Sequence, residues 1–427
     1  MNLHRSIFQQ DISDCTKGQS LLPLRRAREI CLSGIEPIRD TVSVRLSDAA
    51  SRIAGADIMT DASLPRFDNS AMDGFGICSD DLSTPFPKTL QVAGRALAGH
   101  SATASCTPGS ALRILTGAHV PSDVAAVIPQ EQVTIADDTI LISSAPNRGA
   151  NIRRRGEDIL AGSLVLPKGT LIDARHIAML AAIGARRIQV LRPLRVGVIS
   201  TGDELLDDNR ELGPAGIIDV NRPMLRALMA SPMLDVSDLG ICRDDPKCLS
   251  RILRDAAQRI DLLLSSGGIS GSETDCLHHA VVQADGTYER LRVAMRPGKP
   301  IARGRIGAMD IIGLPGNPIS ALLNYFLFGR PALLAKLDAE PPRFVSLKAR
   351  CPEGLPRRFN RSEFLPVRID GTTKYGEPIV SKLGNGSSSS LSPFIAADGF
   401  ILVEAGTGMV DPGELLEFYP FKNAFAI

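Results

Sequence analysis

The chain has 427 residues, of which 44% are hydrophobic and 4% aromatic, so it is long enough for about three domains with apolar cores. Its 48 Lys and Arg residues balance 47 Asp and Glu residues to a net charge of +1, which excludes an electrostatic footprint for nucleic acid over the whole chain. Its eight Cys residues contain no C-x-x-C pair, which argues against a zinc ribbon and a disulfide scaffold.

The first residues, MNLHRSIFQQDISD, lack the apolar core of a secretory signal, and no uninterrupted apolar run approaches the ~18 residues of a membrane span. We therefore expect a cytoplasmic protein without a membrane partner. From Leu21 to Ala56, charged and apolar residues alternate at helical spacing. This pattern predicts two helices around a turn at Gly34 to Asp40.

The segment from Leu64 to Ile77, LPRFDNSAMDGFGI, crowds polar side chains into a short loop between glycines. These side chains are Asp68, Asn69, Ser70 and Asp73. Such a loop is typical of a functional site carried by a scaffold, but it also fits an Asx-type turn that leads into a strand. The residues alone leave both interpretations open.

From Lys88 to Leu166 the chain has short apolar runs interrupted by Gly and Pro, which predict a small all-β domain or barrel. Its basic run, Arg153 to Arg155, is either a solvated face or a site for the acidic tail of a ligand. The spacing in the segment Leu171 to Leu191 predicts a helix that is closed by Gly184. We expect this helix to pack with the N-terminal helices, so that one discontinuous domain flanks the inserted β domain.

The stretch from Leu194 to Asn324 contains apolar runs that each end in a polar, Gly-rich turn: RVGVIS with TGDEL, DLLLSS with GGISGSETD, VAMRPGKPIA, and MDIIGL with PGNPIS. These runs predict buried parallel strands joined by crossover helices. In an open α/β sheet a ligand lies beyond the carboxyl ends of the strands. The turns are therefore predicted to line one pocket.

The composition of these turns indicates an anionic ligand beside a divalent cation. Their glycines allow the backbone to approach a ligand closely: Gly202, Gly267, Gly268, Gly298 and Gly316. Acidic and basic side chains also occur together in them: Asp203, Glu204, Glu273, Asp275, Arg296 and Lys299. This mixture suits a phosphorylated ligand bridged by Mg²⁺. The alternative is a doubly wound domain whose Gly turns only reverse the chain.

Two further segments have polar residues at expected helix starts. Asp219 and Asn221 precede a predicted helix with Pro223 in its first turn. In the turn Arg243 to Pro246, Asp244 or Asp245 either faces the pocket or caps the next helix.

After Pro341, short strands with Ser and Gly turns predict a C-terminal β domain. Its tract from Gly386 to Ser390 is either a flexible linker or a hydroxyl cluster that binds an oxyanion.

In this order and spacing, the motifs resemble those of the molybdopterin molybdenumtransferases, a family that includes the bacterial MoeA proteins and the E domain of gephyrin. The resemblance rests on FDNSAMDGFGI, ILTGAHVP with AAVIPQE, NIRRRGEDI, ISTGDEL, the segment Asp219 to Leu225, RDDP, SSGGIS, MRPGKP and GLPGNPISAL. It implies an elongated α/β plus β chain with four domains. These are a discontinuous helical linker domain (18–56 and 157–192), an inserted β domain with DNSAMDG (57–156), a central doubly wound molybdopterin-binding α/β domain (193–338) and a C-terminal β domain (339–427).

The resemblance further implies an enzyme that inserts molybdate into adenylylated molybdopterin and releases AMP with the help of Mg²⁺. It implies a homodimer whose active cleft is shared between subunits. Candidate partners are the molybdopterin adenylyltransferase and molybdoenzyme chaperones.

Because pyrophosphate cleavage needs metal-held phosphates and a positioned water, the carboxylates of Glu204, Asp244 and Asp275 are the predicted metal ligands and catalytic groups. By resemblance, Asp73 and Thr116 complete the catalytic set from the partner's β domain. The residues predicted to bind the substrates are Thr201, Gly202, Asp203, Asn221, Ser266, Gly267, Gly268, Ser270, Arg296, Pro297, Gly298, Lys299, Pro315, Asn317, Arg361 and Ser387. By resemblance, the molybdate pocket comprises Ser270, Asp275, Arg296, Lys299, Arg361 and Ser387.

The sequence departs from the family pattern where GGISGSETD replaces the usual GGVSVGDYD, and where Arg296 replaces a Lys. An alternative hypothesis is therefore a paralogue that binds molybdopterin or a related nucleotide-linked pterin without inserting molybdenum. It would act as a carrier or scaffold, or would insert tungstate.

Overall fold

The structure, a computed structural model, describes residues 21–207, 214–269, 275–339, 346–384, 387 and 389–421. The predicted Ser270 and Glu273 and part of the serine tract lie outside these ranges. The chain forms two compact units: a smaller unit of residues 43–50 and 54–190, and a larger unit that holds the rest of the described chain. No helix within the described ranges is both long and apolar enough to cross a membrane.

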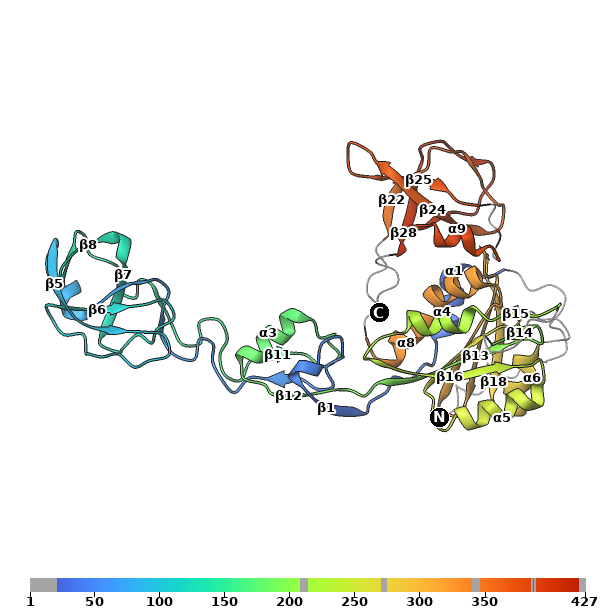
Figure 1. Cartoon of the computed structure of the whole chain (residues 1–427), viewed down its shortest axis with the longest axis horizontal. Helices are drawn as coiled ribbons and strands as arrows, with labels where there is room; N and C mark the ends of the chain where they lie inside the picture. Colours follow the sequence, from blue (N-terminus) through green and yellow to red (C-terminus); the bar gives the residue numbers. More distant parts are fainter. Residues whose placement is uncertain are drawn as a thin grey trace, which may run out of the picture. The chain divides into compact units, whose positions relative to one another are not determined.

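The smaller unit contains a sheet with the order β7-β4-β6-β5-β9-β8 (Figure 1). Its strands are β4 (Gly74–Cys78), β5 (Lys88–Ala96), β6 (Ser110–Ile114), β7 (Val124–Pro129), β8 (Val133–Ala136) and β9 (Thr139–Ile142), with the short helix α2 (Ser79–Leu82) and the 3₁₀ turn η2 (Gln130–Gln132). Successive residues of β4 point to opposite faces of the sheet. Phe75 and Ile77 belong to the apolar cluster on one face, whereas a Cβ at Gly76 would lie 2.7 Å from Ile114 Cδ1, which belongs to the other cluster. The predicted inserted β domain is thus confirmed.

Short strand pairs and one helix make up the rest of this unit. The pairs are β1 (Thr41–Arg45) with β12 (Arg187–Leu191), β2 (Ile58–Met59) with β11 (Leu164–Leu166), and β3 (Asn69–Ser70) with β10 (Ile152–Arg153). The helix is α3 (Ala174–Ala182), whose N-terminus is closed by a capping box between Asp173 and His176.

The second N-terminal helix predicted between Thr41 and Ala56 is wrong. The segment forms β1 followed by the 3₁₀ turn η1 (Leu46–Asp48). Its start, TVSVR, alternates β-branched residues, and β12 supplies the pairing partner. The helix predicted from Leu171 and closed by Gly184 is observed as α3, which ends at Ala182, and the chain then extends into β12.

The larger unit is built on a sheet with the order β16-β13-β17-β21-β20-β18. The first four strands are parallel: β16 (Leu234–Cys242), β13 (Leu194–Thr201), β17 (Leu262–Ser266) and β21 (Met309–Leu314). The fifth strand, β20 (Pro300–Ile306), runs antiparallel to both of its neighbours, β21 and β18 (Thr287–Arg292). A small parallel pair, β14 (Leu205–Leu206) with β15 (Ile217–Ile218), lies after β13.

The run VAMRPGKPIA does not form the predicted parallel strand. Met295 and Arg296 form β19, which pairs with the C-terminal domain, and only the residues from Pro300 onward join this sheet. The register pairs Ile306 with Met309, so β20 and β21 are joined by a two-residue turn. A turn of that length permits only an antiparallel hairpin.

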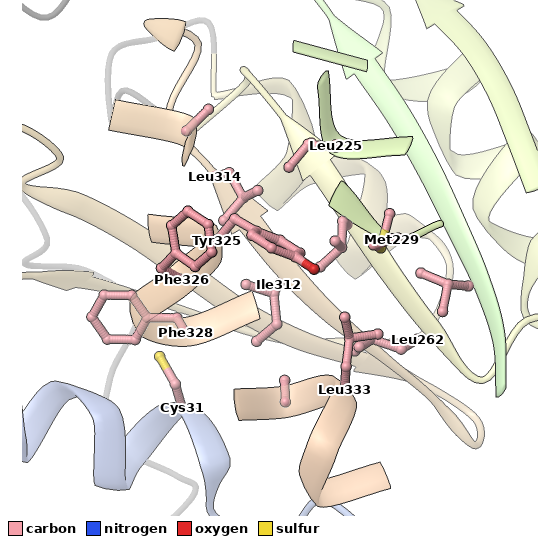
Figure 2. Close-up of a cluster of buried hydrophobic side chains, with 14 of the residues drawn as sticks. Cys31, Leu225, Met229, Leu262, Ile312, Leu314, Tyr325, Phe326, Phe328 and Leu333 are labelled. Atoms are coloured by element: carbon pink, nitrogen blue, oxygen red, sulfur yellow. The ribbon is translucent and has the colours of Figure 1, made fainter. Parts of the chain in front are cut away.

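Both faces of this sheet are covered by helices, which confirms the doubly wound arrangement. On one face, α4 (Asn221–Leu228), α7 (Pro318–Asn324), the π-helical turn η3 (Tyr325–Gly329), α8 (Arg330–Lys336) and α1 (Leu24–Leu32) share a core with the strands (Figure 2). On the other, α5 (Pro246–Ala256) and α6 (Cys276–Gln283) form a second core. Leu262 and Leu264 belong to the first core and Leu263 to the second, because successive strand residues point to opposite faces.

The C-terminal strands form a sheet that closes on itself, with the order β19-β24-β25-β22-β28-β26 and a further pairing of β24 with β26. The elements are β22 (Leu347–Arg350), β23 (Leu355–Pro356), β24 (Ser362–Thr372), β25 (Pro378–Lys382), α9 (Leu391–Ile395), β26 (Gly399–Val403), β27 (Met409–Val410) and β28 (Leu415–Pro420). Since β19 belongs to the chain of the α/β domain, its pairing with β24 joins the two domains.

The two adjacent valines of α6 provide a test of this packing. Val281 is 0% exposed within the second core, whereas Val282 is 53% exposed. We expect Val281→Ala to lower the free energy of unfolding by about 2 kcal/mol through lost burial and a residual cavity. Val282→Ala should be neutral or slightly stabilising, because Ala has the better helix propensity. Urea unfolding followed by circular dichroism measures both, and equal losses would contradict the assigned packing.

Candidate functional site

A cleft of about 1000 Å³ lies in the larger unit at the carboxyl ends of β13, β17 and β21. It is lined by Thr201, Gly202, Glu204, Leu205, Ile217, Ile218, Asp219, Val220, Asn221, Asp244, Ser266, Gly267, Gly268, Ile269, Met295, Arg296, Pro297, Gly298, Lys299, Pro300, Pro315, Gly316, Asn317, Pro318, Ser320, Arg361, Ser387 and Ser389. Because β20 runs antiparallel to β21, its starting turn, Pro297 to Lys299, reaches the same edge. The structure therefore gathers turns that are far apart in the sequence.

The glycine turns pack against one another too closely for side chains. Gly267 has φ 88° and Gly268 has φ 67°. A Cβ on Gly267 would collide with the carbonyl oxygen of Thr201, and one on Gly268 would lie 2.6 Å from Thr201 Oγ1. Gly298, at φ 90°, meets the Asn324 amide, which donates to the Gly298 oxygen at 3.1 Å. The cleft floor thus requires these glycines.

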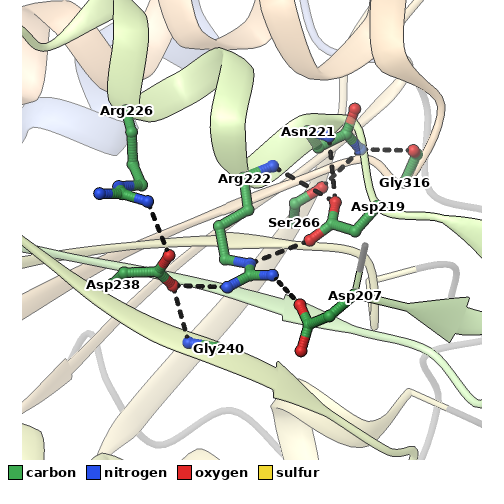
Figure 3. Close-up of polar contacts among 9 residues, drawn as sticks. All are labelled: Asp207, Asp219, Asn221, Arg222, Arg226, Asp238, Gly240, Ser266 and Gly316. Carbon is green, nitrogen blue, oxygen red and sulfur yellow. Dashed lines mark hydrogen bonds and ion pairs between the residues drawn. The ribbon is translucent and has the colours of Figure 1, made fainter. Parts of the chain in front are cut away.

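Asn221 ties three of these segments together (Figure 3). Its Nδ2 donates to Ser266 Oγ at 2.8 Å and to the Gly316 oxygen at 2.6 Å, which links α4 to the turns after β17 and β21. Asp219 Oδ1 accepts the Asn221 N–H at 3.0 Å, and Asp219 Oδ2 accepts from Arg222 Nε at 3.1 Å. The helix start predicted at Asp219 and Asn221 is therefore also a structural junction of the cleft.

The same arginine anchors this junction to the edge of the sheet. Arg222 Nη1 pairs with Asp238 Oδ1 at 2.7 Å, and its Nη2 pairs with Asp207 (Figure 3). These carboxylates outweigh the opposing effect of burial and raise the pKa of the Arg222 guanidinium above its ordinary value.

One end of the cleft is cationic. Lys299, Arg296 and Arg361 line it, together with Ser387, whose Oγ lies 3.0 Å from Ser389 Oγ. Burial lowers the pKa of Lys299, and the charges of Arg292 and Arg361 lower it further. Neighbouring positive charges of this kind favour an oxyanion between them.

The other end is acidic. Burial raises the pKa of the Asp244 carboxyl, and the negative charges of Asp203 and Glu204 add to the effect. Asp244 Oδ1 is buried and has no hydrogen-bond partner among the described residues. The Asp244 N–H donates to Asp203 Oδ1 at 3.2 Å. A buried, unpartnered carboxylate oxygen beside further carboxylates suits a divalent cation.

Within the described ranges, no group of three or more His, Cys, Asp or Glu side chains could hold a metal ion. A cation at Asp244 and Glu204 would therefore complete its shell with ligand oxygens or water, as Mg²⁺ commonly does. The residues present fit such a site.

Asp275 caps the helix that follows β17 in the chain. It is buried at the start of α6, where Oδ1 accepts the His278 N–H at 3.3 Å and Oδ2 lies 3.9 Å from Arg290 Nη1. It is not among the described residues that line the cleft. Asp203 also lies outside the lining but contacts Asp244. The roles of Asp275 and of Ser270, which lies outside the described ranges, stay predictions.

Asp73 and Thr116 belong to the smaller unit and contact each other there. Asp73 Oδ1 accepts hydrogen bonds from Thr116 Oγ1 and from the Thr116 N–H, both at 2.7 Å. These bonds hold the pKa of the Asp73 carboxyl below its ordinary value. In the basic run nearby, Arg154 Nη1 pairs with Asp68 Oδ2 at 2.6 Å.

The structure also answers the question left open for the acidic turn. Asp245 caps α5 by accepting the N–H groups of Lys247 and Cys248, while Asp244 lines the cleft. Two residues of the cleft, Ile217 and Ile218, which form an apolar wall, were not predicted, whereas Ser389 belongs to the tract predicted either as a linker or as a hydroxyl cluster. The available signal for this wall was the pair of adjacent isoleucines in GIIDV. Two such residues before a polar helix start are seldom left in solvent.

Family models match almost the whole chain: the N-terminal region of MoeA (domains I and II) at residues 22–184, a probable molybdopterin binding domain at 197–335, and the MoeA C-terminal region (domain IV) at 348–421. The chain is 35% identical to the molybdopterin molybdenumtransferase of Haemophilus influenzae over 94% of this chain and 99% of that protein. It is 34% identical to molybdopterin molybdenumtransferase 2 of Mycobacterium tuberculosis over 79% and 86% of the two chains.

The solved structures agree with these matches. The molybdopterin biosynthesis MoeA protein of Pyrococcus horikoshii OT3 superposes with a TM-score of 0.78 at 27% identity, covering 94% of this chain and 100% of that one.

The raised pKa of Asp244 has a testable consequence. An acid whose pKa is higher in the folded state than in the unfolded state destabilises the fold when it ionises. This cost is absent at a pH below the unfolded-state pKa and complete at a pH above the folded-state pKa. We therefore expect Asp244→Asn to raise the melting temperature at pH 7 without divalent ions, and the gain to vanish as the pH falls through the carboxyl range. The control is Asp245→Asn, because Asn caps helices about as well as Asp. A loss of stability in Asp244→Asn at pH 7 would contradict this account.

Proposed function

The chain belongs to the MoeA family of molybdopterin molybdenumtransferases, and on that premise we propose that it inserts molybdate into adenylylated molybdopterin and releases AMP. The observation that carries the proposal is the distribution of charge in the cleft. Positive charge lies at one end, on Lys299, Arg296 and Arg361, and negative charge lies at the other, on Glu204 and Asp244. Such a cleft can hold oxyanions and a phosphate-bound cation at once.

At the cationic end, the chain binds and orients the oxyanions. Lys299 and Arg361 carry positive charge, and Ser387 offers a hydroxyl group, which together suit the tetrahedral dianion molybdate. Arg296 is held in place by Glu363, whose Oε1 accepts from its Nη1 at 3.0 Å. A fixed guanidinium loses less entropy on binding than a mobile one.

At the acidic end, Glu204 and Asp244 would hold Mg²⁺. When bound, this ion neutralises phosphate charge and polarises the bond to be broken. The phosphorus–oxygen bond between the two phosphates breaks. One phosphate leaves as part of AMP, the other stays on the pterin, and water supplies the new oxygen. The proton of that water goes to a phosphate oxygen of the products, while Asp244, as a metal ligand, stays ionised.

The apolar wall of the cleft suits the flat pterin. Ile217 and Ile218 are exposed and line the cleft, where the Ile217 N–H donates to the Glu204 oxygen at 2.9 Å. An aliphatic surface of this kind stabilises a planar heterocycle by excluding water from its faces.

We further propose that the protein is a cytoplasmic homodimer and that Asp73 and Thr116 take part in catalysis. The two hydrogen bonds that the Thr116 hydroxyl and backbone N–H donate to Asp73 Oδ1 fix this carboxylate and support such a role. The molybdopterin adenylyltransferase would supply the substrate.

The second candidate is a paralogue that binds the nucleotide-linked pterin without inserting molybdenum, or that inserts tungstate. It is favoured by the unusual turn GGISGSETD. Purified protein given adenylylated molybdopterin, Mg²⁺ and molybdate separates the candidates: AMP release that depends on molybdate supports the first, release with tungstate alone supports a tungstate enzyme, and binding without release supports the carrier.

The role of Glu204 can be tested by removing its charge. Glu204→Gln should retain pterin binding but lower the rate of AMP release about a hundredfold, because a neutral amide is a poorer ligand for Mg²⁺ than a carboxylate. Release is measured by chromatography over a range of Mg²⁺ concentrations. The exposed Glu353→Gln serves as the matched control. Unchanged turnover in Glu204→Gln would assign this carboxylate elsewhere.

The cationic end can be tested by molybdate binding. Lys299→Gln should raise the Kd for molybdate about tenfold, because a charge-assisted contact contributes roughly 1.5–3 kcal/mol. Lys348→Gln, which removes a surface lysine paired with Glu417, should leave the Kd unchanged. Isothermal titration measures both, and equal affinities for the two variants would place the molybdate site away from Lys299.

A further inference from the structure

Two short strands beside the cleft lie outside the apolar cores. β14 directly follows Glu204, and β15 consists of Ile217 and Ile218. These three residues all line the cleft. None of the four residues of the two strands belongs to an apolar cluster among the described residues, and Ile217 is 54% exposed. We call this pair of strands the β14–β15 wall.

Backbone hydrogen bonds join the two strands of the wall to each other. The Ile217 N–H donates to the Glu204 carbonyl oxygen at 2.9 Å, and the Asp219 N–H donates to the Leu206 carbonyl oxygen at 3.1 Å. An isolated pair of strands is only marginally stable in water. The β14–β15 wall therefore needs other contacts to keep a fixed position.

Arg222 supplies such contacts at the ends of both strands (Figure 3). Its Nη2 pairs with Asp207, the residue after β14, and its Nε donates at 3.1 Å to Oδ2 of Asp219, the residue after β15. Its Nη1 pairs with Asp238 Oδ1 of β16 at 2.7 Å. One guanidinium group thus ties the ends of both strands to the six-stranded sheet.

These contacts are largely shielded from solvent. The side chain of Arg222 is 13% exposed and that of Asp219 is 2% exposed, so salt screens their attraction little. Asp238 is itself fixed, because its Oδ1 accepts the Gly240 N–H at 2.9 Å and its Oδ2 accepts from Arg226 Nη1 at 2.9 Å. The planar guanidinium has enough donors for three carboxylates at once, which a lysine lacks the geometry to match.

Arg222 and Asp207 are not among the described residues that line the cleft, so they act on a ligand through the wall and not by contact. We propose that Arg222 is a positioning residue of the substrate site, which holds the β14–β15 wall, with Glu204 and Ile217, where the pterin and its metal ion bind. The inference rests on the proposed function, which supplies the substrate. Without the Arg222 contacts, fewer molecules have the wall in place, and the Kd rises by the inverse of that fraction.

The first measurement is hydrogen exchange in the wall, which needs no substrate. Arg222→Gln would leave three carboxylates without their shared partner and can unfold the junction, so the test removes Asp207, which is 41% exposed. Asp207→Ala should speed amide exchange at Ile217 and Asp219 about tenfold, because β14 loses its tie to the sheet. A tenfold change corresponds to about 1.4 kcal/mol. Asp207→Glu keeps the carboxylate and should retain slow exchange.

The second measurement is the binding of adenylylated molybdopterin to the whole protein with Mg²⁺. Asp207→Ala should raise the Kd and the KM at least threefold, whereas kcat at saturating substrate and Mg²⁺ should stay within twofold, because bound substrate restores the position of the wall.

The matched control is Arg226→Ala, which breaks another ion pair of Asp238 but does not touch the wall. It should change neither the exchange of the wall amides nor the Kd. Thermal unfolding should be the same for Asp207→Ala and Arg226→Ala, because neither side chain belongs to an apolar core.

Unchanged exchange in Asp207→Ala, or equal acceleration in Arg226→Ala, would overturn the inference even if the enzyme releases AMP. Faster exchange in Asp207→Ala without a rise in Kd would also overturn it, because the Arg222 contacts would then be only structural. If exchange and Kd change as expected but the wild type yields no AMP, the positioning role stands and the proposed function fails.

Discussion

The cleft depends on a direct contact between two backbone turns. The turn after β17 lies against the end of β13 so closely that a side chain on Gly267 would overlap the Thr201 carbonyl. Asn221 fastens the turn after β21 to the same place through Ser266 Oγ and the Gly316 oxygen. Because parallel strands end at one edge and the turns interlock there, the cleft walls are assembled by the fold itself.

The charges of the cleft are kept apart by this frame. The acidic groups Glu204 and Asp244 follow β13 and β16, whereas Lys299 precedes the antiparallel β20 and Arg361 precedes β24 of the C-terminal domain. If these side chains were free to meet, they would neutralise one another as surface ion pairs. Fixed on separate elements, they leave one end for oxyanions and the other for a cation, and the β19–β24 pairing holds the C-terminal contribution in place.

The site also keeps polar groups that the fold does not satisfy. Thr201 Oγ1, Asn221 Oδ1 and Asp244 Oδ1 are buried without hydrogen-bond partners among the described residues. All three residues line the cleft. A buried oxygen without a partner costs folding free energy, which a ligand that donates a hydrogen bond to it, or a cation bound to it, would recover.

The sequence by itself determined the family, the order of the apolar runs and the Gly turns, because turn chemistry and strand hydrophobicity are local properties. It also pointed to Lys299, in a Gly turn, and to Asp244, in an acidic turn, and the structure places both in the lining of the cleft. Only the tertiary structure decided what depends on distant pairing: that residues 41–45 form a strand against β12, that β20 runs antiparallel, and that Asp275 caps α6. The ion pair between Arg296 and Glu363 belongs to the same class, because the two residues meet only through the β19–β24 register, which no local pattern encodes.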